Sequence, residues 1–191
     1  MRFILIVLFV IFVACHPTSQ RGLVVIRKPP PACPATPAVL APAADVEAIA
    51  ALDASGEVTY TCRNGAWQVA HVDTVLGLVS VDGIDMHHTG STLTWNDASS
   101  ATLTQAASAT VSATSQPWLL WNVSARGPIA GQLSSVTQVQ RLSTTGGVAP
   151  TASCGTGNAG QAVEVPATSR YYLYRPVTAS STTPYFRCGG S

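Results

Sequence analysis

The chain has 191 residues, only 10% of which are charged, and its formal net charge at pH 7 is +1. Soluble domains usually carry about 25% charged residues, so we expect a surface built largely from Ser, Thr, Ala and Gln. The near-neutral balance, without a basic run, argues against nucleic acid as a partner, and the length suits one domain with a tether.

The first residues of the chain have the pattern of an export signal. Arg2 precedes an unbroken apolar run from Phe3 to Ala14, and Cys15 follows at once. This run is shorter than the ~20 residues that a helix needs to cross a bilayer, but it fits the apolar part of a secretory signal. A cysteine directly after such a run resembles a bacterial lipoprotein signal, in which the thiol is acylated. We therefore predict a signal peptide at residues 1–14 and a lipid anchor on Cys15, with free secretion as the alternative.

A proline-rich segment follows the signal, at residues 15–42. Closely spaced prolines keep a chain extended without internal hydrogen bonds. We expect this segment to be a tether that holds a folded domain clear of the membrane. The domain itself is predicted at residues 43–176, and residues 177–191 form a Ser/Thr-rich tail.

From Asp45 onward the sequence is typical of short strands separated by turns. Residues 45–50 fit either a helix or a strand, and their surroundings favour a strand. Asn64-Gly65 and Asp82-Gly83 are hairpin signals. The other strand candidates are Val58–Cys62, Ala66–Val69, Val75–Val81, Thr92–Trp95, Thr102–Val111, Trp118–Val123, Gln132–Leu142, Ala162–Val165 and Tyr171–Tyr174. This spacing predicts an all-β fold, a single antiparallel β-sandwich or barrel (jelly-roll-like) of about eight or nine strands.

Two adjacent histidines are the first candidates for chemistry. On a strand His87 and His88 point to opposite faces, so they cannot easily bind one metal together. Asp85 and His87, two residues apart, share a face and fit a carboxylate–imidazole dyad or two ligands of a metal. The alternative is a structural role for a solvated or hydrogen-bonded histidine beside a hairpin. We predict no metal site and no cofactor.

Two further residues complete the candidate ligand-binding set of His87, Asp85, Trp95 and Arg141. An exposed tryptophan on a polar β domain suits stacking on a sugar ring or a partner side chain, and the alternative is a tryptophan that belongs to the core. Arg141 offers five fixed donors, which suit either bracing of the Thr144–Pro150 loop through its carbonyls or contact with a ligand.

Several segments resemble one family. They are Ser135–Pro150 with Cys154, Gly56–Cys62, Pro117–Leu120 and Tyr171–Tyr174. Together they are similar to a family of exported bacterial and fungal proteins that is known only as a domain of unknown function, over about Ala38 to Tyr174. The resemblance implies a β-rich single domain and no established activity.

The middle of the chain departs from the pattern of that family. Ser91 stands where the family has Pro, Leu93 stands where it has Trp, and Trp95 comes two residues late. If this segment lines a ligand site in the family, the site is altered or lost here.

Four cysteines follow Cys15, and three pairings of them are possible. Export places them where disulfides persist. Because Cys62 and Cys154 both lie in the family-like region, we expect them to pair, and Cys33 then pairs with Cys188 and ties the tether to the tail. A metal site is the alternative, but no close pair of cysteines or Cys/His cluster has ligand spacing.

These observations predict an exported, lipid-anchored β domain of the bacterial cell envelope. We expect it to be a non-catalytic binding or structural module. Its predicted partners are the membrane, through the lipid on Cys15, and a glycan or an envelope protein. The alternative is a hydrolase or metal-dependent enzyme that uses His87, Asp85 and Arg141.

Overall fold

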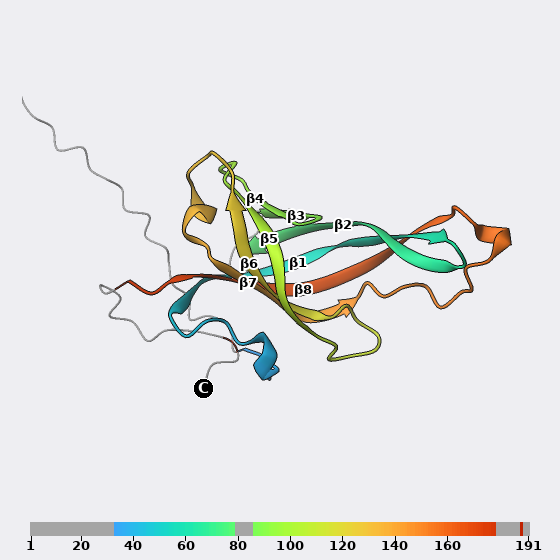
Figure 1. Cartoon of the computed structure of the whole chain (residues 1–191), viewed down its shortest axis with the longest axis horizontal. Coiled ribbons are helices and arrows are strands. Elements are labelled where there is room, and N and C mark those ends of the chain that lie inside the picture. The colour runs from blue at the N-terminus through green and yellow to red at the C-terminus, as the bar shows by residue number, and fades with distance from the viewer. Residues whose placement is uncertain (1–32, 79–85, 179–187, 189–191) are drawn as a thin grey trace, which may run out of the picture.

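The computed structural model describes residues 33–78, 86–178 and 188, which form one antiparallel sheet closed into a barrel (Figure 1). The signal, Cys15 and most of the predicted tether lie outside the described residues, as do Asp82-Gly83 and Asp85. The strands are β1 (Val46–Arg63), β2 (Ala66–Leu78), β3 (Met86–Thr89), β4 (Thr92–Trp95), β5 (Ser100–Ala109), β6 (Trp118–Arg126), β7 (Gln138–Gly146) and β8 (Ala162–Pro176). Three short 3₁₀ turns accompany them: η1 (Ala38–Leu40), η2 (Gln132–Ser135) and η3 (Thr156–Asn158).

The order of strands in the sheet follows the order in the chain, and β1 closes the ring by pairing with both β2 and β8. The all-β antiparallel prediction is confirmed, and of its two alternatives the structure shows the barrel. Since every strand pairs with its neighbours in sequence, the described sheet is a meander and lacks the crossing connections of a jelly roll.

β1 and β8 are each longer than the sequence pattern predicts. The candidate strands at residues 45–50 and 58–62 belong to one strand, and the two candidates near the C-terminus likewise merge into β8. The residues between them pair across the two strands, as Asp53 does with Arg170. The side chains of this pair also form an ion pair of 2.8 Å. The ambiguous segment after Asp45 is therefore a strand, as its surroundings indicate.

The hairpin between β1 and β2 forms where Asn64-Gly65 predicts it. These residues have φ angles of +53° and +77°, which a two-residue hairpin turn requires and which glycine adopts without strain. β1, β2 and β8 continue beyond the other strands as a long arm (Figure 1). The Cys62–Cys154 disulfide fastens the loop between β7 and β8 to this arm, as does a 2.7 Å bond from Trp67 Nε1 to the Ala152 carbonyl.

The prediction of a strand over Gln132–Leu142 is wrong for its first half, where the chain forms η2 and β7 begins only at Gln138. Two acceptors explain the turn. Asp97 Oδ2 accepts from the Gln132 amide at 2.7 Å, and Ser99 Oγ accepts from the Leu133 amide at 3.1 Å. Side-chain acceptors at a helix start favour a turn over continued pairing, and Leu133 is fully buried by it.

Two hydrophobic cores lie on opposite faces of the barrel wall. The inner core fills the barrel, and its buried members are Leu52, Ala54, Leu76, Met86, Leu93, Ala101, Leu103, Trp121, Leu133, Val136, Val139, Tyr171 and Leu173. The outer core covers part of the outside of the wall with Leu40, Val46, Trp118, Leu120, Leu142, Tyr172, Tyr174 and Cys188. Trp118 and Trp121 thus face opposite sides of β6, as an odd separation on a strand dictates.

The outer core includes the end of the segment that the sequence indicates as a tether. Leu40, in η1, is fully buried, and the Cys33–Cys188 disulfide lies at the edge of the same core. Residues 33–42 therefore lie against the barrel as a strap. The domain boundaries themselves remain predictions.

Candidate functional site

The most polar cluster inside the barrel wall is centred on Arg141. This residue lies in β7, faces inward and is 8% exposed. Its Nη2 donates to Gln116 Oε1 at 3.2 Å and to the Pro117 carbonyl at 3.0 Å. Its guanidinium carbon lies 5.6 Å from the centre of the Trp121 ring, within the range of a cation–π contact.

Arg141 braces a loop, but its bonds go to a different segment from the one that the sequence predicts. Its direct bonds go to residues 116–117, before β6, and not to the carbonyls of the Thr144–Pro150 loop. Gln116 connects Arg141 to that loop, because its Nε2 donates to the Gly147 carbonyl at 2.6 Å. Tyr60 donates to the same carbonyl at 2.8 Å, so three separate segments meet at Gly147.

His88 packs beside this cluster and is 3% exposed. Its Nδ1 lies 2.7 Å from the hydroxyl of Tyr171, while its Nε2 is buried without a hydrogen-bond partner. Burial, and then the positive charge of Arg141, lower the pKa of His88 from 6.5 to about 4. The imidazole is therefore neutral at physiological pH.

The aromatic neighbours of His88 complete the interior cluster. Its ring meets Trp121 and Tyr171 edge-on, at 5.4 and 5.6 Å between centres, and those two rings stack on each other at 5.9 Å. Burial raises the pKa of Tyr171 to about 12. Histidine, arginine and two aromatic rings thus form a compact group whose ionisable members keep one charge, on Arg141.

Among the described members of the candidate ligand-binding set, the structure does not bring His87 and Arg141 together. His87 is exposed on the outer side of β3, whereas Arg141 is buried on the inner side of β7. Trp95 is half-buried at the end of β4 and packs on the inner core. Asp85 lies outside the described residues, so its pairing with His87 stays a prediction.

The sequence did not predict the interior partners His88, Gln116 and Tyr171 as a group. One signal was available, since His88 shares a strand face with the apolar Met86, and that alternation indicates an inward histidine. Nothing local indicated that Tyr171, 83 residues later, would be its partner.

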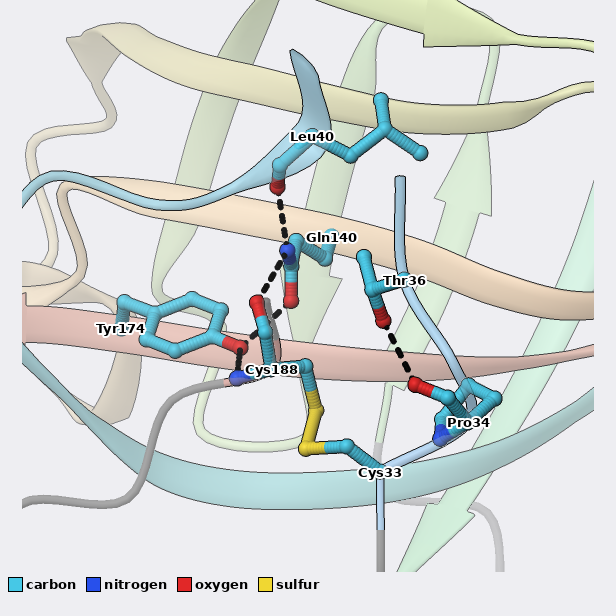
Figure 2. Close-up of a disulfide and its surroundings, with 7 residues drawn as sticks. All are labelled: Cys33, Pro34, Thr36, Leu40, Gln140, Tyr174 and Cys188. Atoms are coloured by element: carbon cyan, nitrogen blue, oxygen red, sulfur yellow. Dashed lines mark hydrogen bonds between the residues drawn. A yellow bond between two sulfur atoms is a disulfide. The ribbon is translucent and has the colours of Figure 1, made fainter. Parts of the chain in front are cut away.

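A second polar cluster holds the two ends of the described chain on the outer wall (Figure 2). Gln140, fully buried in β7, donates through Nε2 to the carbonyls of Leu40 and Cys188. Its Oε1 accepts from the hydroxyl of Tyr174, which in turn accepts from the Cys188 amide at 3.2 Å. We call these residues, with the Cys33–Cys188 disulfide, the clasp.

Both predicted disulfides are present. Cys33 pairs with Cys188 and Cys62 with Cys154, at Cα separations of 5.3 and 5.4 Å. No group of three His, Cys, Asp or Glu side chains in the described ranges is arranged to hold a metal ion. Across the same ranges, no helix combines the length and the apolar character that a bilayer crossing demands.

Comparison with known proteins adds one finding. Residues 75–175 match a family described as "Protein of unknown function (DUF3455)". The match covers more than half of the chain and contains the Ser135–Pro150 signature, but it begins after the Gly56–Cys62 segment. No curated protein and no solved structure matches the chain. The chain therefore belongs to the DUF3455 family of proteins of unknown function.

Proposed function

We propose that this protein is an exported β-barrel module, held at the bacterial cell envelope by a lipid on Cys15, that acts by binding and not by catalysis. The observation that supports export is the pair of disulfides. Disulfides persist in oxidising compartments and are rare in the cytosol, and here they fasten the strap and the arm to the barrel.

The filled interior supports a binding role at the surface. An eight-stranded barrel is just wide enough either to be filled by side chains or to hold one small ligand. Here the inner core occupies it with leucines and aromatic rings, many of them fully buried. A partner such as a glycan or an envelope protein then meets the outer faces and the mouth of the barrel.

The placement of the histidines argues against the enzyme alternative. A general base must lie within hydrogen-bond reach of its reacting group and its supporting residues. His87 and Arg141 lie on opposite faces of the wall, so they cannot act on one substrate without a rearrangement of the strands.

Detergent partitioning with mass spectrometry of the N-terminal peptide tests the anchor. Wild type is expected in the detergent phase, with an acylated Cys15 as its first residue. Cys15→Ser is expected in the aqueous phase without a lipid mass, while the neighbouring Thr18→Ser behaves as wild type. Unchanged partitioning and an unchanged N-terminal mass in Cys15→Ser would contradict the anchor.

A glycan array tests the binding role directly with the oxidised protein. We expect retention on a defined class of glycans and its loss after the protein is reduced and unfolded in denaturant. Absence of retention, together with failure to cross-link any envelope protein in intact cells, would contradict a binding module.

A further inference from the structure

The arm formed by β1, β2 and β8 has two outer strand edges (Figure 1). β1 lies in the middle, because it pairs with β2 on one side and with β8 on the other. β3 pairs with β2 only from Asp73 onward, and β7 reaches along β8 only as far as Ala167. Across the described ranges, residues 66–71 and 162–165 therefore have no strand on their outer side. Unpaired edges are places where another strand can add.

The two edges differ in the residues that discourage such addition. The β8 edge contains Glu164 and is followed by Pro166, and both a charge and a proline disfavour pairing at an edge. The other edge, which we define as Ala66–Val69 and call the β2 edge, contains neither. Trp67 and Val69 are residue types that favour strands, and Val69 is 56% exposed. Of these two edges, the β2 edge is the one open to another strand.

A bulge limits the length of the β2 edge. Ala70 is an extra residue without a partner in β1, so the regular register ends just before it. Beyond the bulge, the carbonyl of Val72 already accepts from the Gly90 amide at 3.4 Å. The regular stretch is therefore short, which suits a weak and reversible contact and not an obligate interface.

Charges beyond the two ends of the β2 edge favour a second copy of this chain as the added strand. Arg63 lies beside the hairpin at one end, Asp73 lies past the bulge at the other, and both are exposed. When two such strands pair antiparallel, the Arg63 end of each copy lies beside the Asp73 end of the other. Opposite charges then approach at both ends, and the uncharged middle adds no repulsion. A parallel arrangement would bring like charges together.

We propose that the β2 edge is a dimerisation site, at which the β2 strands of two copies pair antiparallel. Both copies use the same edge, so the contact is two-fold symmetric and closes on itself. Glu164 and Pro166 keep the β8 edges blocked, which prevents growth into a longer sheet. This inference goes beyond the proposed function and does not depend on export, on the lipid or on a glycan ligand.

Sedimentation equilibrium of the oxidised protein in a density-matched detergent measures the association. We expect the mass to rise from one chain toward two between about 10 μM and 1 mM, as for a weak interface, and to stop there. Hydrogen exchange at low and high concentration locates the contact, because amides within residues 66–69 should gain protection and those within 162–165 should not. A chain that stays monomeric throughout, growth past two chains, or a dimer without protection at residues 66–69 would overturn the proposal.

A charge placed in the middle of the β2 edge should break the contact. Gln68→Glu is expected to weaken the dimer about tenfold, because the two added carboxylates lie near each other across the symmetry axis. Gln105→Glu is the matched control, since Gln105 is also exposed but lies on β5, and it should leave the association unchanged. Equal weakening by the two variants would show that net charge controls the association, which would contradict the site.

Exchange of the end charges tests the antiparallel arrangement independently. Arg63→Glu and Asp73→Lys should each weaken the dimer about three- to tenfold, because each brings like charges together at both ends. The double variant restores opposite charges and should recover the affinity of the wild type. Losses that add in the double variant would contradict a second, antiparallel copy at the β2 edge.

Discussion

At the scale of single residues, Gln140 is the most constrained polar side chain of the outer wall. It is fully buried, and its amide satisfies two carbonyls and one hydroxyl that belong to three other segments. Buried polar groups stabilise a structure only when each has its partner. Gln140 therefore fixes the strap and Cys188 at one position on the outside of the barrel.

Replacement of Gln140 by Leu should be strongly destabilising. The substitution leaves the carbonyls of Leu40 and Cys188 without donors, and each such buried group costs about 1–3 kcal/mol. We expect a loss of about 2–5 kcal/mol in the free energy of unfolding, measured by denaturant titration of the oxidised protein. Gln138→Leu, at a half-buried position of the same strand, is the matched control and should cost less. Equal losses in the two variants would contradict the clasp.

His88 should make the stability of the fold depend on pH. Its pKa in the folded state is lowered to about 4 by burial and by Arg141. The unfolded state therefore binds more protons between pH 6.5 and 4, and stability falls as the pH is lowered through that window. The full effect is on the order of 3 kcal/mol.

Unfolding by urea between pH 7 and 4 measures this effect. The free energy of unfolding of His88→Gln should fall less between pH 6.5 and 4 than that of the wild type. His87→Gln, the same change on the outer face, should keep the slope of the wild type. A wild-type slope in His88→Gln would show that the interior histidine is not the group that titrates.

At the scale of elements, the sequence predicts the turns and strand faces that are determined by residues close together in the chain. The Asn64-Gly65 turn, the opposite faces of His87 and His88, and the opposite faces of Trp118 and Trp121 all follow from strand periodicity or from local turn chemistry. The extent of β1 and β8 does not follow from such patterns. These strands are long because distant residues pair, and a local window contains only one of the two partners.

Gly56 shows how closely the long strands approach. A Cβ added at this position would overlap the Asp73 carbonyl of β2. We expect Gly56→Ala to lower the free energy of unfolding by about 1–3 kcal/mol, as overpacking does. Gly155→Ala is the control, because a Cβ there meets open space. Thermal unfolding of both variants measures the difference, and a Gly56→Ala variant as stable as Gly155→Ala would show that β1 and β2 are not this close.

The two disulfides should act on different elements. Cys33→Ser with Cys188→Ser releases the strap, while the ring of strand pairs contains neither residue. Removal of a disulfide from a small exported domain costs about 2–5 kcal/mol. We expect that variant to be cut by protease within residues 33–45, with the barrel left intact.

Cys62→Ser with Cys154→Ser is the counterpart for the arm, since this bond holds the β7–β8 loop. It should be cut within residues 147–161 and keep a protected strap. Cleavage of both variants at the same positions would contradict separate roles for the two bonds.

At the scale of the whole molecule, closure of the ring brings together residues that are far apart in the sequence. β1 lies beside β8, and Arg141 of β7 lies beside the residues that precede β6. All-β character and the number of strands follow from composition and spacing, whereas the interior cluster exists only once the ring is closed. Of the candidate ligand-binding residues, His87 and Arg141 stay apart because they face opposite sides of the barrel wall.

On the proposed function, this barrel folds outside the cytosol, and disulfides fasten the ends of its chain. The most direct measurement is mass spectrometry of peptides from the native protein, isolated from cells with its thiols blocked. We expect linked peptides for Cys33–Cys188 and Cys62–Cys154, on a chain that begins at an acylated Cys15. A chain that retains Met1 and carries free thiols at all four positions would contradict export and oxidative folding.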